Sequence, residues 1–155
     1  MYAIEPLTFA HTCFIAANIR AADYAEWVAE TGETKKFAIA YSSFFSSPEH
    51  LKWVYLYNNS PVAAAGFAPI YPHLASIWMF GIAASDKAFP RLAKYLLTVG
   101  REKAEKSGIR RVEARTLGRA NSWLTRLGGT LEAVMPQYGV NGETFYLYSW
   151  VKTGE

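Results

Sequence analysis

Apolar residues recur along this chain with two spacings, one typical of helices and one typical of strands. Helical spacing dominates the first third of the chain, where Gly32 and Pro48 end two of the segments. Leu51 to Tyr57 is rich in aromatic and β-forming residues, as in a strand. Helices are therefore predicted over residues 7–18, 21–30, 34–46, 86–106 and 119–127. Strands are predicted over residues 51–57, 61–69, 74–83, 110–116, 131–135 and 144–151.

The order of these segments predicts how the strands lie in the sheet. Asn58-Asn59-Ser60 is a turn, so Leu51 to Ala83 is expected to form three neighbouring antiparallel strands. A long helix, Asp86 to Lys106, then connects two strands, and a crossover of that length places them parallel. We predict an α/β (α+β) fold, with a central, mixed, mostly antiparallel sheet flanked by helices. The residues expected in the core beside the last two helices are Phe89, Leu92, Leu96, Trp123 and Leu127.

Composition and cysteine content narrow the class of protein. The chain has 155 residues, of which 51% are apolar, and this suits one folded domain spanning residues 1–155. Cys13 is the only cysteine, which excludes an intrachain disulfide and favours a reducing compartment. Met1 to Pro6 lacks the features of a secretion signal, and no apolar run approaches the roughly 20 residues of a membrane span. A cytoplasmic protein without a membrane segment is expected.

Positive charge is concentrated in the second half of the chain. Lys87 to Arg126 contains 11 of the 16 basic residues and only three acidic ones, so its net charge is 11 − 3 = +8, and the rest carries −5. One interpretation is an anionic partner such as a phosphate-bearing cofactor, and the other is a solvated helix face. Nucleic acid is not favoured, because Glu102 and Glu105 interrupt the basic helix.

Several familiar kinds of catalytic chemistry are not supported by the sequence. The histidines His11, His50 and His73 share no spacing that a metal site would need, so no metal is predicted. The chain also lacks a Gly-x-Ser-x-Gly elbow and a phosphate-binding Gly-Lys-Ser/Thr loop.

The order of the predicted elements, together with three segments, resembles the GNAT superfamily of acyl-CoA N-acyltransferases over nearly the whole chain. The residues of the three segments more specifically resemble a branch of GNAT-like or internal virion-type proteins found in tailed phages. The three segments are Ala17-Asn18-Ile19-Arg20-Ala21-Ala22-Asp23, Asn121-Ser122-Trp123-Leu124-Thr125-Arg126-Leu127-Gly128 and Asn141-Gly142-Glu143-Thr144-Phe145-Tyr146. The resemblance implies acetyl-CoA or CoA as a ligand, and a protein of the infected host's cytoplasm or of the virion.

The chain departs from the family at the turn that holds the CoA pyrophosphate. Catalytic members carry Arg/Gln-x-x-Gly-x-Gly/Ala there, since only small residues let the backbone approach a phosphate closely. This chain has Ala83-Ala84-Ser85-Asp86-Lys87-Ala88-Phe89-Pro90, without a glycine. If CoA binds, its phosphates are expected near Ser85 to Phe89, with Lys87 and Arg91 supplying charge. The alternative is an ordinary helix start with Ser85 or Asp86 as its N-cap.

Further ligand contacts are implied by the resemblance. Gly81, with its neighbours Phe80 and Ile82, lies at the end of the strand along which a ligand is expected, although a strand glycine is also typical of a bulge. Asn121 is a candidate cofactor ligand, or alternatively the N-cap of the short helix.

The resemblance also asks for a base that deprotonates the amine and an acid for the leaving thiolate. No acidic residue lies between Lys52 and Ser85, so His73 is the candidate base and Tyr138 the candidate acid. For His73 the competing interpretation is a surface loop histidine.

Two functional classes remain. One is an acetyl-CoA-dependent N-acetyltransferase, acting on a protein or a small amine, with an atypical cofactor loop. The other is a degenerate acetyltransferase-like protein that keeps the fold and acts by binding a host or phage protein. The missing glycines favour the second class.

Overall fold

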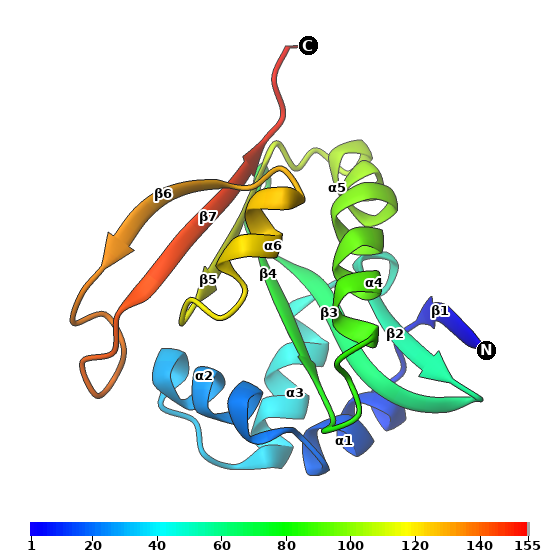
Figure 1. Cartoon of the computed structure of the whole chain (residues 1–155). Helices are drawn as coiled ribbons and strands as arrows, with labels where there is room; N and C mark the ends of the chain where they lie inside the picture. The colour runs from blue at the N-terminus through cyan, green and yellow to red at the C-terminus, as the bar shows by residue number, and fades with distance from the viewer. Residues whose placement is uncertain (155) are drawn as a thin grey trace.

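The computed structural model describes residues 1–154 and contains one seven-stranded mixed sheet with helices on both faces (Figure 1). The strands lie in the order β1-β2-β3-β4-β5-β7-β6, and β4 and β5 form the parallel pair. This confirms the predicted fold class, the three adjacent antiparallel strands and the parallel neighbour. The strand bounds are β1 Tyr2–Pro6, β2 Lys52–Tyr57, β3 Ser60–Tyr71, β4 Leu74–Gly81, β5 Arg111–Thr116, β6 Thr130–Met135 and β7 Phe145–Val151.

The helices form two groups, one on each face of the sheet (Figure 1). The first group is α1 (Phe9–Ala17), α2 (Ala21–Thr31) and α3 (Lys36–Ser46), followed by the 3-10 turn η1 (Glu49–Leu51). The second group is α4 (Ala88–Tyr95), the π-helical turn η2 (Leu96–Gly100), α5 (Arg101–Lys106) and α6 (Asn121–Arg126). The predicted long crossover helix is thus α4, η2 and α5 in succession, and it starts two residues later than expected. Within residues 1–154, no helix has the length and apolar character needed to cross a membrane.

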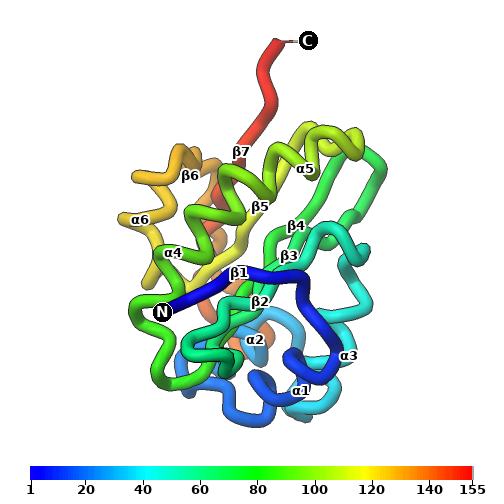
Figure 2. Tube along the Cα trace, turned by 90° about the vertical axis from the view of Figure 1, so that its right-hand side faces the viewer, coloured from blue at the N-terminus to red at the C-terminus, as the bar shows by residue number. Residues whose placement is uncertain are grey.

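One strand was not predicted from the sequence. β1 pairs antiparallel with β2 and forms an edge of the sheet, in front of the other strands in Figure 2. Its side chains are mostly exposed on both faces, so it lacks the run of apolar and aromatic residues by which β2 is recognised. The hairpin that follows β2 was predicted correctly: Asn58 and Asn59 form a two-residue turn with φ of 47° and 70°, the conformation such a turn needs.

The core has two parts, separated by the sheet. Phe89, Leu92 and Leu96 are buried on the side of α4, as predicted. Trp123 and Leu127 were expected to be mostly buried but are only partly so, and Leu124 is the buried residue of α6. The helix is six residues long, so only a single residue of it points directly into the core.

Candidate active site

A cavity of about 280 Å³ lies where β4 and β5 separate. The two strands pair only through Leu74–Ser76 and Arg111–Glu113, and beyond that point they diverge. Side chains on the later part of each strand line the cavity, among them Met79 on β4 and Thr116 on β5. The gap therefore lies between two strand edges that do not pair across it.

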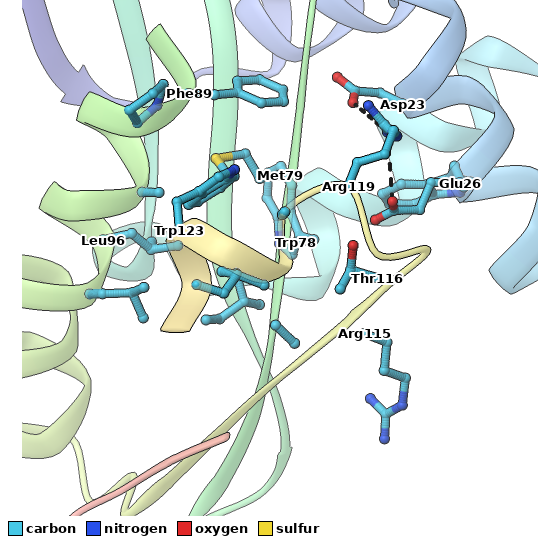
Figure 3. Close-up of a pocket in the computed structure, with 18 of the residues that line it drawn as sticks. Asp23, Glu26, Trp78, Met79, Phe89, Leu96, Arg115, Thr116, Arg119 and Trp123 are labelled. Carbon is cyan, nitrogen blue, oxygen red and sulfur yellow. Dashed lines mark ion pairs between the residues drawn. The ribbon is translucent and has the colours of Figure 1, made fainter. Parts of the chain in front are cut away.

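The cavity is bounded by both layers of helices and has two chemically different sides (Figure 3). On the side of α4 and α6 its wall is mainly apolar, formed by Phe89, Pro90, Ala93, Leu96, Trp123 and Leu124. On the side of α2 it carries charged side chains and a tryptophan: Arg20, Asp23, Glu26, Trp27 and Glu30. An elongated ligand that passes between β4 and β5 would meet apolar side chains at one end and carboxylates at the other.

The charged side is held in place by Asp23, a buried carboxylate on the first turn of α2. Its Oδ2 accepts a hydrogen bond from the N–H of Gly81 at 2.9 Å and pairs with Nε of Arg20 at 2.8 Å. The Arg20 backbone N–H in turn donates to the carbonyl of Gly81 at 2.9 Å. These contacts fix the start of α2 to the end of β4. Burial raises the pKa of Asp23, and the contacts with Arg20 and Gly81 offset part of that rise.

Arg119, in the connection between β5 and α6, closes the same region from the other strand. Its Nη2 donates to the carbonyl of Ala22 at 3.1 Å and lies 3.8 Å from Asp23 and 3.7 Å from Glu26 (Figure 3). The pKa of Glu26 is raised, mainly because burial disfavours its charge, while the N–H of Leu117 and the charge of Arg119 lower it. Glu30 is more exposed to solvent, but the surrounding protein still raises the pKa of its carboxylate, and the charge of Arg115 offsets part of that rise.

The start of α4 differs from the expected capped helix. Lys87 is its N-cap residue and makes no side-chain capping bond, so neither Ser85 nor Asp86 serves as the cap. Within the described chain, the backbone N–H groups of Asp86, Lys87 and Ala88 have no protein acceptor. Such N–H groups at a helix start can bind an anion. Asp86 does not lie there as a free charge, because it pairs with Nη1 of Arg20 at 3.5 Å.

Arg20 also stacks on the ring of Phe89, with 3.8 Å between the guanidinium carbon and the ring centroid. It is therefore a cation held at the start of α4 by three neighbours. The sequence assigned that place to Lys87 and Arg91. Lys87 is exposed at the helix start, but Arg91 points the other way, where it donates to the Tyr55 hydroxyl and stacks on Tyr2.

The other predicted ligand residues lie around the cavity rather than in it. Gly81 is needed for packing, since a Cβ there would lie 2.8 Å from Phe89 and from Ser85. Phe80 is fully buried on the opposite face against Trp27, and Ile82 bridges to Ile19. The Ser85 hydroxyl is buried without a hydrogen-bond partner among residues 1–154.

Asn121 begins α6, whose N-cap is Ala120, so its predicted capping role is wrong. Its Oδ1 is buried and, within the described residues, has no hydrogen-bond partner. A role for Asn121 or Ser85 in holding a cofactor stays a prediction.

His73 and Tyr138 are not brought together by the fold. His73 lies in the turn before β4, at the end where β4 pairs with β5 and away from the cavity. Its ring stacks beside Tyr71 and its carbonyl accepts from the N–H of Arg110 and Arg111. Tyr138 lies in the connection between β6 and β7 against Phe145 and does not line the cavity. Their catalytic roles stay predictions, and the cavity itself presents other titratable groups.

The residues of α2 that line the cavity were not predicted from the sequence. Asp23, Glu26, Trp27 and Glu30 have the spacing i, i+3, i+4 and i+7, which places them on one face of a helix. Three acids and a tryptophan on the inward face are an unusual pattern for a packed helix and were a usable signal. Groups of three or more His, Cys, Asp or Glu side chains able to hold a metal ion are not found within residues 1–154.

The fold of the chain is similar to that of solved acetyltransferases. Ard1 from Thermoplasma volcanium matches with a TM-score of 0.73 and 13% identity over 99% of both chains. An N-acetyltransferase from Staphylococcus aureus Mu50 matches with 0.73 and 15%, over 97% of this chain and 98% of that one. The putative acetyltransferase YncA from Salmonella typhimurium, solved with acetyl-CoA, matches with 0.71 and 15%, over 99% and 95%.

No protein-family model matches the chain, and comparison with curated protein sequences finds no match. At such low identities the structural likeness concerns the fold. The chain has the fold of the GNAT acetyltransferases: a single α+β unit whose seven-stranded mixed sheet is flanked by helices.

Proposed function

We propose that this chain is an acyl-CoA-dependent N-acyltransferase whose reaction takes place in the gap between β4 and β5. The observation that supports this most strongly is the cavity that runs between the two strands, apolar on the side of α4 and α6 and acidic on the side of α2. Such a cavity can hold an acyl thioester at one side and an amine at the other. When bound, acyl-CoA supplies an acyl group already activated for attack by nitrogen.

The unpaired edge of β4 suits the extended, amide-bearing arm of CoA. The N–H and carbonyl groups of successive residues in a strand point to opposite edges, so those of Met79 point to the same edge of β4 as those of Gly81. At Gly81 these two groups bind Asp23 and Arg20 at the start of α2. The strand β5 pairs with this edge of β4 only as far as Ser76. Met79 therefore presents an N–H and a carbonyl toward the gap, as a sheet edge does when it binds an extended chain.

The start of α4 fits the phosphate end in a way that differs from a glycine-rich turn. Among residues 1–154, the N–H groups of Asp86, Lys87 and Ala88 have no protein acceptor, and the cations Lys87 and Arg20 lie beside them. Asp86 competes for Arg20, so binding of an anion here is expected to be weaker than at an unobstructed helix start.

Titration of the purified chain with acetyl-CoA tests the proposal, since binding is required for any transfer. Desulfo-CoA and a phosphate-free pantetheine thioester show which end is recognised. We expect acetyl-CoA and desulfo-CoA to bind alike, and the phosphate-free compound to bind more weakly. If acetyl-CoA produces neither heat nor a change in melting temperature even at millimolar concentration and low salt, the proposal is wrong.

A second candidate function is binding of a protein partner without catalysis, as the resemblance to phage proteins implies. It is supported by an aromatic stripe on α3 formed by Phe37, Tyr41 and Phe45, each of which is more than half exposed. Binding of a partner through this stripe should be lost in Tyr41→Ser and retained in Ala114→Phe, which fills the cavity. The opposite pattern would exclude this stripe as the binding surface.

A further inference from the structure

The face of α2 that lines the cavity carries negative charge that the protein balances only in part. Asp23, Glu26 and Glu30 follow one another along this face, and all three line the cavity. Like charges one helical turn apart destabilise a helix, and Glu30 also lies in the last turn, where negative charge is unfavourable. No basic residue lies in that turn. A cation bound in the cavity would relieve this repulsion.

Both carboxylate oxygens of Asp23 make contacts within the protein. One of its oxygens holds the N–H of Gly81 and the guanidinium of Arg20, and the other faces Arg119. It is buried, so a ligand has little access to it. Asp23 therefore positions α2 and leaves ligand binding to the carboxylates further along the helix.

Glu26 and Glu30 are the two carboxylates on this face of α2 that have an oxygen available to bind a ligand. Both contacts of Glu26, the N–H of Leu117 at 3.3 Å and Arg119 at 3.7 Å, are made by Oε2. Its Oε1 has no hydrogen-bond or ion-pair partner in the described part of the chain, and neither has the carboxylate of Glu30. Arg115, the cation on β5 whose charge acts on Glu30, pairs with Glu113 at 3.0 Å.

Trp27 lies between these two residues and also lines the cavity. Its ring meets Phe80 edge-on at 5.7 Å, which fixes its orientation. An aromatic ring flanked by carboxylates is a common environment for an ammonium group, because the ring attracts cations without repelling the alkyl part of an amine.

We propose that Glu26, Trp27 and Glu30 form the acceptor subsite of the cavity, which binds a primary amine in its ammonium form, and that Glu26 takes up the proton the ammonium must lose. This assignment rests on the proposed acyltransferase function. It also explains how catalysis proceeds although His73 lies away from the cavity. The acceptor is an amine without a carboxylate on the carbon next to nitrogen, because the two carboxylates of the subsite would repel it.

The proton and bond balance of the reaction is simple. The ammonium gives one proton to Glu26, which passes it to solvent. The freed amine nitrogen forms a bond to the acyl carbon, the carbon–sulfur bond breaks, and the second proton of the nitrogen goes to the departing thiolate. The products are an amide, a thiol and one released proton.

The surroundings of Glu26 suit a proton acceptor. Burial, with Asp23 and Glu30 nearby, raises its pKa, whereas Leu117 and Arg119 limit the rise. A carboxylate with a raised pKa is closer in basicity to the amine and so accepts its proton more readily.

Two substitutions separate the roles. Glu30→Gln removes one charge from the subsite, so the KM for the amine should rise about tenfold with kcat nearly unchanged, as when uniform binding is lost. Glu26→Gln keeps an oxygen for the N–H of Leu117, so the chain should fold, but kcat should fall by about 10²–10⁴-fold. The acid limb of the pH–rate profile should disappear in Glu26→Gln. Glu102→Gln, in an exposed pair on α5, is the control.

A binding measurement that needs no turnover accompanies the kinetics. A primary alkylamine such as 1,4-diaminobutane should raise the melting temperature of the wild type, and the matching diol should not. Both glutamate variants should lose this shift, whereas Glu102→Gln should keep it. Acetyl-CoA should bind the wild type and all three variants equally.

The outcomes distinguish the two proposals. Suppose that acetyl-CoA binds, but that the glutamate variants equal the wild type both in the melting-temperature shift caused by the amine and in the KM for the amine. The proposed acceptor subsite is then wrong, and the acyltransferase proposal stands. If acetyl-CoA does not bind the wild type at all, the acyltransferase proposal is wrong, and with it the role of Glu26 in catalysis.

Discussion

Arg20 lies at the start of α4, where Arg91 was predicted from the sequence to supply positive charge. Arg91 belongs to the basic stripe of α4, but that helix face turns toward β1 and β2, where the guanidinium is bound by Tyr55. Arg20 lies far away in sequence, at the start of α2, and reaches α4 because the Ile19–Ile82 bridge brings the two segments together. Long-range placement of this kind has no local signal, whereas the exposed position of Lys87 could be predicted from the helix start alone.

Asp86 is the residue whose charge most directly opposes an anionic ligand at α4. We predict that Asp86→Asn strengthens acetyl-CoA binding about two- to fivefold at low salt, because Arg20 is then free to contact a phosphate. Titration calorimetry at low and high salt measures this, and the gain should shrink as salt rises. Glu49→Gln, on η1, is the control. Weaker binding by Asp86→Asn would mean that Asp86 helps to shape the site rather than obstruct it.

Glu132, on β6, should govern part of the acid stability of the sheet. Hydrogen bonds from Arg111 and then Ser149 lower its pKa to about 2. A lowered pKa stabilises the fold above the ordinary value of 4.5, and that contribution is lost as pH falls toward 2. Glu132→Gln should therefore cost about 0.5–1 kcal/mol at neutral pH.

The difference in unfolding free energy between Glu132→Gln and the wild type should narrow as the pH is lowered from 5, as followed by urea titration. Glu5→Gln, on the exposed strand β1, is the control. A difference that stays constant down to acid pH would show that the contacts of Glu132 do not depend on its charge.

The elements that were predictable are those with a strong apolar pattern. β2, β3 and β4 are nearly continuous apolar runs, the crossover repeats its apolar residues at helical spacing, and the structure confirms these elements. β1 was missed because Tyr2–Pro6 pairs on one side only and exposes most of its side chains. α2 was predicted as a helix, but its acidic inward face was not expected, because helix faces that turn toward a core are normally apolar.

The crossover helix offers a comparison between two buried leucines. Leu92 is enclosed in the core, whereas Leu96 is equally buried but also lines the cavity. Replacing either with Ala should destabilise the fold by about 2–5 kcal/mol, and the cost should be higher for Leu92, since the space left at Leu96 merges with an existing cavity. Thermal or urea unfolding of both variants measures this. A larger loss at Leu96 would show that the cavity is filled by well-packed side chains in solution.

At the scale of the whole molecule, function depends on how far β4 and β5 separate. The sequence predicts that they are parallel neighbours, since a long helix joins them. It does not predict that pairing stops after three residues, because that depends on the start of α2 binding Gly81 at the end of β4. The site is consequently assembled from α2, β4, β5, α4 and α6, and no single segment of the sequence contains it.

The most direct test of this account is calorimetric titration of acetyl-CoA into the wild type and into Ala114→Phe. Ala114 is buried on β5 and lines the cavity, so a phenylalanine there should fill the gap between the strands. Ala25→Phe, on the exposed side of α2, is the matched control. We predict that the wild type and Ala25→Phe bind acetyl-CoA with equal affinity and that Ala114→Phe, although folded, does not bind it. Equal binding by a folded Ala114→Phe would contradict the placement of the active site between β4 and β5.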